Sequence, residues 1–210
     1  MTRSHQKAKV WAMCMTDETE ATTPCAEEEI TYTNRFMRAR TNPNNMYYTP
    51  DDAMDFIAGH LAPFKRVWEC CSGQNHITRY LERRGHTVMA TDIDTGHDMF
   101  AYAPPPDDYD IIVTNPPFQG KRRILERLYE LGKPFAVLMP TMALNSNPVR
   151  LLLKADPDWG ILMPPKSINY IPGDHPNAAT LTKKPKGSRS FFHSSWFCHK
   201  VPTIRGMVIA

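Results

Sequence analysis

From residue 49 onward, apolar residues recur at two different spacings along the chain. Three segments, 49–61, 76–85 and 121–132, carry apolar residues three and four positions apart, which is the spacing of one helix face. Short apolar runs bounded by charged or turn-forming residues lie between them, and this pattern is typical of buried strands. The sequence therefore predicts strands at 66–70, 87–92, 109–115 and 134–140.

The ends of two of these helices are marked by specific residues. Thr49 is a favourable N-cap, Pro50 fits the first helical position, and two acidic residues follow in the first turn, where the helix dipole stabilises them. Gly85 is predicted to end the second helix, because glycine readily adopts the left-handed conformation found after helix C-termini.

Strands that alternate with helices through short connections predict an α/β fold. We expect a doubly wound, mostly parallel sheet of seven strands, in which the strand-rich chain after Trp159 supplies an antiparallel edge strand. Residues 41–210 are expected to form this single domain. Residues 1–40 show no regular period and are expected to form a flexible or loosely docked N-terminal arm.

Composition narrows the classes of protein to consider. A net charge of +3 is compatible with a polyanionic partner without requiring one. No apolar run reaches the roughly 18 residues of a membrane-spanning helix, and the N-terminus lacks the apolar region of a secretory signal. The five cysteines lack zinc-site spacing, so we expect a reducing, intracellular setting and no bound metal.

Polar side chains follow three successive predicted strands. Glu69 ends the first of them and Gly73 lies in the next turn, Asp92 ends the second, and Asn115 ends the third. Ligands of doubly wound sheets bind at these carboxyl ends, and a carboxylate about 20 residues after the turn is placed to bind ribose hydroxyls. The turn lacks the full glycine pattern of dinucleotide-binding proteins, so a purely structural turn, with Asp92 as a cap, is the alternative interpretation.

The order and spacing of Glu69, Gly73, Asp92 and the motif Asn-Pro-Pro-Phe at 115–118 resemble the class I S-adenosylmethionine-dependent methyltransferases. Within that class, the chain is most similar to the small phage-type N6-adenine DNA methyltransferases, over about residues 46–200. The resemblance implies a Rossmann-like sheet and S-adenosylmethionine as cofactor. It also implies methyl transfer to an exocyclic amine, N6 of adenine in DNA, with weak sequence specificity.

The resemblance assigns several residues to cofactor binding. Glu69 and Gly73 match the turn that packs against the methionine part of the cofactor. Asp92 matches the acid that holds the ribose, and Ile93 matches the apolar residue beside the adenine. Asp98 matches the acid that contacts the adenine amino group.

An upstream motif completes the cofactor assignment. The segment Tyr-Tyr-Thr-Pro at 47–50, with Tyr48, Thr49 and Pro50, resembles the motif that helps to hold the methionine end, and Asn115 is expected beside the transferred methyl group. The chain departs from the family pattern at Asn75, where a second glycine is usual. Asparagine tolerates the left-handed backbone better than most residues, so cofactor binding remains compatible with this departure.

The four residues of the Asn-Pro-Pro-Phe motif suit the chemistry of an exocyclic amine. Such an amine is a poor nucleophile because its lone pair is delocalised into the ring. The Asn115 side chain and the Pro116 backbone each offer a carbonyl oxygen to one N–H group, which favours a pyramidal nitrogen. Pro116 and Pro117 stiffen the turn, and Phe118 is suited to stack on a base. A rigid exit from a strand is the alternative interpretation.

Two basic clusters are candidates for phosphate contacts, with DNA favoured over RNA as the partner. Their alternative interpretation is a solvated surface. They consist of Lys121, Arg122 and Arg123 after the motif, and of Lys183, Lys184, Lys186 and Arg189 in the late segment 173–190.

Other acceptors and a binding role stay open at this point. Adenine in RNA and a glutamine amide in a protein are alternative substrates, because the same motif serves planar amides. A nucleic-acid-binding module on this fold is the non-enzymatic alternative, to which the departure at Asn75 lends weight. Phe191, Phe192 and Trp196 are candidates to lie near a base, although Trp196 is favoured as a core residue.

Overall fold

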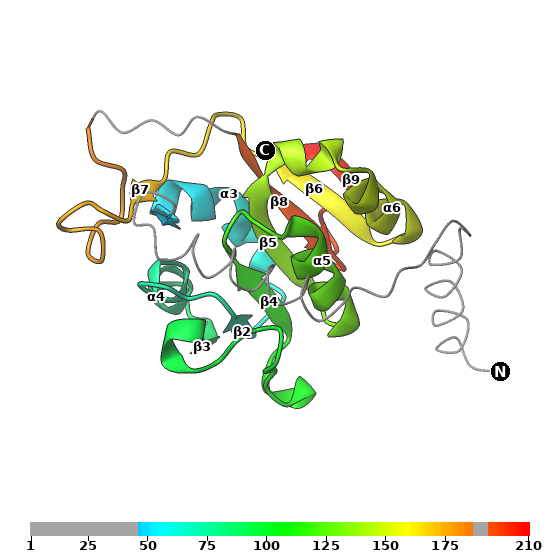
Figure 1. Cartoon of the computed structure of the whole chain (residues 1–210), viewed down its shortest axis with the longest axis horizontal. Coiled ribbons are helices and arrows are strands. Elements are labelled where there is room, and N and C mark those ends of the chain that lie inside the picture. The colour runs from blue at the N-terminus through cyan, green and yellow to red at the C-terminus, as the bar shows by residue number, and fades with distance from the viewer. Residues whose placement is uncertain (1–45, 187–192) are drawn as a thin grey trace, which may run out of the picture. The chain divides into compact units, whose positions relative to one another are not determined.

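The computed structural model describes residues 46–186 and 193–210. The predicted N-terminal arm, Arg189, Phe191 and Phe192 lie outside the described residues. Most strands of the domain belong to one sheet, which is visible in Figure 1. Its strands are β2 (Arg66–Glu69), β3 (Thr87–Ala90), β4 (Ile111–Thr114), β5 (Phe135–Pro140), β6 (Trp159–Met163), β8 (Ser194–His199) and β9 (Gly206–Ile209).

The seven strands are arranged in the order β3-β2-β4-β5-β8-β6-β9. The pairs β2–β3, β2–β4, β4–β5 and β6–β9 are parallel. β8 is the antiparallel strand and pairs with β5 on one side and β6 on the other. The predicted α/β class with a mostly parallel seven-stranded sheet is therefore confirmed, and its antiparallel strand lies toward the β9 edge.

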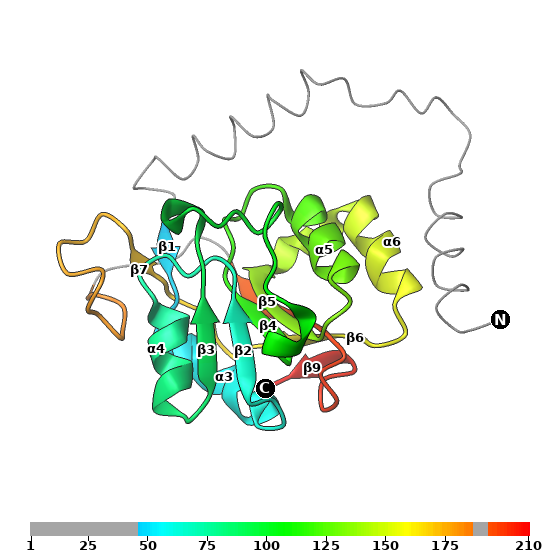
Figure 2. The same ribbon diagram turned by 90° about the horizontal axis from the view of Figure 1, so that it is seen from below.

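Four helices cover the two faces of this sheet. In Figures 1 and 2, α3 and α4 lie on one face and α5 and α6 on the other. The alternation of side chains along β5 accounts for this arrangement. Its Ala136 and Leu138 belong to the core beneath α3 and α4, whereas Val137 and Met139 belong to the core beneath α5 and α6. The helices are α3 (Asp51–Leu61), α4 (His76–Arg83), α5 (Lys121–Glu130) and α6 (Asn147–Ala155).

Trp196 of β8 is a core residue, as favoured from the sequence. Its side chain is fully buried in the core beneath α3 and α4. Its indole Nε1 donates a hydrogen bond to the carbonyl oxygen of Ala53 over 3.2 Å. Trp196 therefore anchors α3 to the sheet and does not line the cavity described below.

The prediction that Thr49 caps α3 is wrong. The helix begins at Asp51, and its N-cap is Pro50, which has an extended backbone with φ −75° and ψ 158°. The carbonyl oxygen of Pro50 accepts the hydrogen bond from Ala53 N. Thr49 is instead buried at the cavity. The predicted end of α4 is confirmed, since Gly85 follows the helix with φ 84°.

A small antiparallel ladder lies apart from the main sheet. It joins β1 (Tyr47–Tyr48) to β7 (Ile171–Pro172), two segments that are far apart in the sequence. Figure 2 shows the two strands side by side near the end of the main sheet toward which β2 and β3 point. Short 3-10 helices complete the connections at Ile93–Thr95, Pro106–Asp108 and Thr141–Asn145. In the described part of the chain, no helix combines the length and apolar character needed to cross a membrane.

Candidate active site

A cavity of about 220 Å³ lies at the carboxyl ends of β2, β3 and β4, where the polar side chains were expected to converge. Residues distant in the sequence meet there, because parallel strands bring their carboxyl ends to one edge. The predicted site residues that line it are Tyr48, Thr49, Glu69, Gly73, Asp92, Asn115, Pro116, Pro117 and Phe118.

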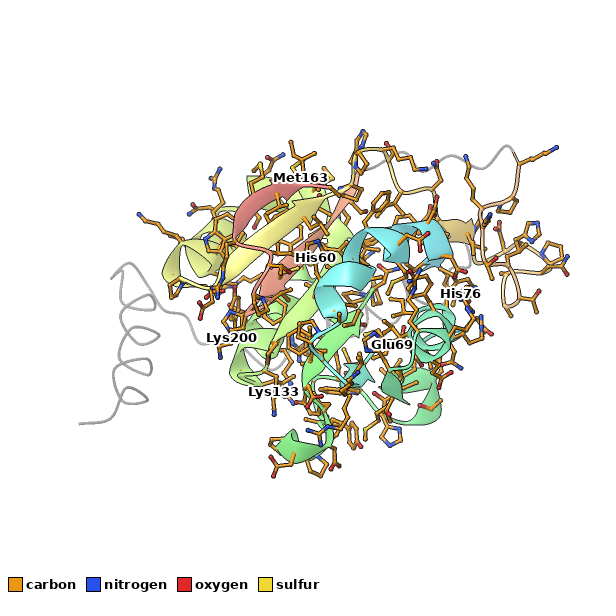
Figure 3. All side chains as sticks on the ribbon, turned by 180° about the vertical axis from the view of Figure 1, so that it is seen from behind. His60, Glu69, His76, Lys133, Met163 and Lys200 are labelled. Atoms are coloured by element: carbon orange, nitrogen blue, oxygen red, sulfur yellow. The ribbon has the colours of Figure 1, made fainter. Side chains whose placement is uncertain are left out.

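Glu69 is a buried carboxyl group in the cavity wall. Only 1% of its surface is exposed, and its Oε2 accepts a hydrogen bond from the Thr78 hydroxyl. Burial raises the pKa of Glu69 well above its usual range, and the bond from Thr78 opposes this shift. Figure 3 shows Glu69 and His76 in the same part of the molecule, near α4. A cation in the cavity would favour the ionised form of Glu69.

Asp92 ties the two turns of the cavity together. Its Oδ2 accepts a hydrogen bond from Gly73 N over 2.9 Å, and its Oδ1 accepts one from Asp94 N over 3.0 Å. It also forms a capping box with Thr95 at the start of the 3-10 helix. Asp92 is therefore the N-cap of this 3-10 helix. A carboxylate oxygen can accept more than one hydrogen bond, so the role of a cap is compatible with a place in the cavity wall.

The turn after β2 depends on two residues with left-handed backbones. Gly73 has φ 49°, and a Cβ atom added to it would lie 3.3 Å from Cε1 of Tyr48. The Tyr48 ring in turn stacks on His76, with ring centroids 4.9 Å apart and planes 10° apart. Asn75, at φ 59° and ψ 33°, is the N-cap of α4. Asparagine thus takes up the conformation that a glycine would adopt, which explains how the departure from the family pattern is accommodated.

Asn115 presents one end of its amide to the protein and leaves the other unsatisfied. Its Nδ2 donates a hydrogen bond to the carbonyl oxygen of Tyr47 over 3.2 Å. Its Oδ1 is buried and has no hydrogen-bond partner among the described residues. A carbonyl oxygen only accepts hydrogen bonds, so Tyr47 determines which end of the amide faces it. A buried acceptor without a partner costs about 1–3 kcal/mol, which a donor from a ligand would recover.

Aromatic rings surround Phe118. It stacks with Tyr47 at a centroid distance of 6.0 Å and an interplanar angle of 25°. Tyr170 meets Phe118 edge-on at 5.7 Å and Tyr47 at 6.0 Å. Tyr47, Tyr170 and His76 were not among the residues predicted for the site. The paired tyrosines of the upstream motif were the available signal for Tyr47, whereas nothing in the local sequence links Tyr170 or His76 to the motif at 115–118.

Three residues assigned to the cofactor by resemblance do not line the cavity. Pro50 is the N-cap of α3, and Ile93 begins the 3-10 helix after Asp92. Asp98 is partly buried, and its Oδ1 accepts a hydrogen bond from Phe100 N over 3.0 Å. Their roles toward the cofactor remain predictions.

The first basic cluster begins α5, two positions after Gln119 of the cavity wall, and its members differ in their contacts. Arg122 forms an ion pair of 2.7 Å with Glu126, and Arg123 lies over the Phe100 ring at 4.3 Å. Lys121, at the start of α5, is half-buried. The lysines of the second cluster are exposed in the segment that follows β7, and they are Lys183, Lys184 and Lys186.

Cys71 also lines the cavity, as a neutral thiol. Its hydrogen bond with the Cys70 thiol, followed by burial, raises the pKa of Cys71 well above its usual value. A thiolate nucleophile is therefore disfavoured at this position near neutral pH. Within the ranges 46–186 and 193–210, no cluster of three or more histidine, cysteine or acidic side chains is placed to hold a metal ion.

Neither a protein-family model nor a curated protein matches the sequence. Among solved structures, the chain is similar to a protein from Vibrio vulnificus YJ016 that is described as the modification subunit of a type I restriction enzyme. The TM-score is 0.48 and the identity 14%, over 86% of this chain and 50% of that one. The chain therefore spans half the length of that subunit.

The chain is also similar to the plantazolicin methyltransferase BpumL in complex with SAH and a triazolic desmethylPZN analog. The TM-score is 0.44 and the identity 10%, over 93% of this chain and 96% of that one. For the complex of BpumL with a monoazolic analog and SAH, the TM-score is 0.37 at 10% identity. Because these likenesses are distant, the function proposed below rests on the geometry of the cavity.

Proposed function

We propose that this protein transfers a methyl group from S-adenosylmethionine to an exocyclic amine, and that the amine is N6 of adenine in DNA. The observation that carries the proposal is the orientation of Asn115. Its Nδ2 is bound to the Tyr47 carbonyl, and its buried Oδ1 has no partner in the described part of the chain. An acceptor fixed in this way is suited to one N–H of an amine.

The residues present fit S-adenosylmethionine. When bound, this cofactor supplies an electrophilic methyl group on a positively charged sulfur. The buried carboxyl group of Glu69 suits a cationic ligand, and the Asp92 carboxylate lines the cavity, where ribose hydroxyls can donate to it. Gly73 keeps the turn free of a side chain at the point where Tyr48 approaches it.

The turn at 115–118 activates and holds the amine. Asn115 Oδ1 accepts one N–H, and the buried Pro116 offers its backbone carbonyl oxygen to the other. These two bonds favour a pyramidal nitrogen whose lone pair is available for attack. Phe118 offers its face to the base, which restricts the base to one plane. Positioning of this kind supplies much of the rate in such transfers.

DNA is the proposed partner because the basic residues at 121–123 begin α5 only two positions after Gln119, which lines the cavity. A base inside a duplex must be extruded before its amine can reach the turn. The lysines after β7 suit phosphate contacts, which position a duplex without reading its sequence. We therefore propose a weak sequence preference.

Methyl-labelled S-adenosylmethionine offered separately with DNA, RNA and total protein tests the acceptor. The expected result is label in DNA, and an Asn115→Ala variant should lose that label. Label in RNA or in protein glutamine alone would replace DNA as the substrate. A protein that binds S-adenosylmethionine but labels none of the three would contradict the proposed activity.

A further inference from the structure

Tyr47 contacts both functional groups of the turn at 115–118. Its carbonyl oxygen accepts from Asn115 Nδ2 over 3.2 Å, and its ring stacks with Phe118 at 6.0 Å. We infer that Tyr47 is a positioning residue for the transfer, which sets the orientation of the Asn115 amide and braces the Phe118 ring. This inference rests on the proposed function and extends it to a residue outside the motif.

The register of the small ladder explains why the Tyr47 carbonyl is available. Gly173 N donates to the carbonyl oxygen of Met46 over 2.8 Å. Tyr47 lies opposite Pro172, one position further along. Hydrogen-bonded and non-hydrogen-bonded pairs alternate along an antiparallel ladder, so the Tyr47–Pro172 pair is non-hydrogen-bonded. The Tyr47 carbonyl therefore points away from β7, toward Asn115.

Pro172 suits this position because it has no N–H to leave unpaired at a non-hydrogen-bonded site. The two edges of β1 thus have different partners. One edge pairs with β7, and the other supplies the acceptor for Asn115. The orientation of the amide is fixed by a segment 68 residues earlier in the chain, which is in turn held by a segment beyond residue 170.

The ring of Tyr47 acts on the second group of the turn. Tyr47 and Tyr170 contact Phe118 from two directions, stacked and edge-on. Tyr170 is 1% exposed and forms a fixed support, whereas Tyr47 and Phe118 both line the cavity. Without the Tyr47 ring, the Phe118 ring should be able to rotate out of the orientation in which it stacks on a base.

The carbonyl contact is tested by Asn115→Asp, because a backbone carbonyl is unaffected by substitution at its own residue. An ionised carboxylate is acceptor-only and repels the Tyr47 carbonyl. A protonated carboxyl has one O–H donor and one acceptor, as the amide has. The measured quantity is the turnover of Asn115→Asp divided by that of the wild type, with S-adenosylmethionine and DNA both saturating. This ratio should rise by about tenfold or more as the pH falls and the new carboxyl becomes protonated. A tenfold change corresponds to about 1.4 kcal/mol. A ratio that is flat or falls with decreasing pH would overturn the orienting role.

The ring is tested by Tyr47→Ala, with Tyr47→Phe as the conservative variant. Tyr47→Ala should raise KM for DNA and lower kcat while the affinity for S-adenosylmethionine changes little, and Tyr47→Phe should recover most of the loss. Tyr102→Ala is the matched control, because Tyr102 is a half-buried ring that packs on Trp68 and His97 outside the cavity. Equal losses in Tyr47→Ala and Tyr102→Ala would show a general effect on stability and overturn the bracing role.

The contact itself has a readout that needs no activity. In the wild-type protein, nuclear Overhauser effects should connect the Asn115 side-chain amide protons to the Tyr47 Hα and the Tyr48 amide proton. Their absence would overturn the inference even if DNA is methylated. Their presence in a protein that labels no acceptor would uphold the contact while the proposed function fails, so the two failures are distinguishable.

Discussion

The backbone amide of Gly73 donates a hydrogen bond to Oδ2 of Asp92 across 2.9 Å, which ties the turn after β2 to the end of β3. The same carboxylate holds Asp94 N through Oδ1. A single side chain thus holds the backbone of the turn after β2 and of the turn after β3. Asp92, which is assigned to the ribose, therefore also has a structural role in holding these two turns together.

Replacing Asp92 should affect binding and stability together. Asp92→Ala should weaken S-adenosylmethionine binding by about 1.5–3 kcal/mol, the scale of hydrogen bonds to a charged group, and should lower the melting temperature. Asp110→Ala is the matched control, since its carboxylate also accepts two backbone N–H bonds, from Lys65 and Arg66, away from the cavity. Calorimetry should show weakened binding in the first variant alone, and equal affinities in both would refute the ribose assignment.

Removing the Asn115 side chain should separate chemistry from cofactor binding. Loss of one preorganised polar contact typically lowers the rate by about 10²–10³, so Asn115→Ala should lose turnover on that scale while its affinity for S-adenosylmethionine changes far less. Asn169→Ala is the control, because Asn169 donates to Ser167 O outside the cavity. Near-normal turnover of Asn115→Ala in single-turnover kinetics would rule out the assigned role.

Cofactor affinity should depend on pH through Glu69. Burial raises the pKa of this carboxyl, so a proton occupies it over a range in which an exposed glutamate is ionised. A cationic ligand favours the ionised form, and binding therefore releases that proton. Affinity should rise as the pH rises through the raised pKa, and Glu69→Gln should bind more weakly with a flatter pH profile. Isothermal titration in buffers of different ionisation enthalpy measures the released proton, and no release would contradict this role.

Glu69 should also make the free energy of unfolding of the ligand-free protein depend on pH. The folded state holds the Glu69 proton more tightly than the unfolded chain, whose pKa is near the ordinary value of 4.5. The free energy of unfolding should therefore fall as the pH rises from that value through the raised pKa. Glu69→Gln should remove this part of the slope in urea titrations at several pH values, and an unchanged slope would show that Glu69 titrates normally.

Neutralising the late basic segment should weaken DNA binding without changing sequence preference. Substitution of Lys183, Lys184, Lys186 and Arg189 by Gln should flatten the dependence of log K on log salt by up to about 0.9 per lost phosphate contact. The control neutralises four lysines that do not line the cavity. Figure 3 shows two of them, Lys133 and Lys200, together and distant from Glu69 and His76. The control set is Lys65, Lys133, Lys154 and Lys200. An unchanged salt dependence in the variant of the late segment would place the DNA contacts elsewhere.

The parts of the fold predicted from sequence are those with local signals. The apolar spacing at 121–132 predicts α5, and the apolar run before Asn115 predicts β4. Both signals depend only on residues that are close together in the sequence. The start of α3 was misplaced because Asp51 N donates to the Thr182 carbonyl, a contact between segments far apart in the sequence. Thr49, freed from capping, is buried at the cavity.

The site was predictable to the extent that it consists of strand ends. Glu69, Asp92 and Asn115 follow successive parallel strands, so their convergence follows from topology alone. The contact of Tyr47 with Asn115 depends on the β1–β7 ladder, and two-residue strands have no periodicity to detect. Local pattern identifies the groups that carry the chemistry, whereas their orientation depends on pairing between distant segments.

The acceptor atom can be identified by nucleoside analysis of DNA after incubation with methyl-labelled S-adenosylmethionine. Digestion to nucleosides identifies the atom that received the methyl group. The label should elute as N6-methyldeoxyadenosine, and it should disappear with Asn115→Ala but not with Asn169→Ala. Label on a ring carbon such as C5 of cytosine, or N6-methyldeoxyadenosine formed equally by Asn115→Ala, would contradict the claim that the turn at 115–118 activates an exocyclic amine.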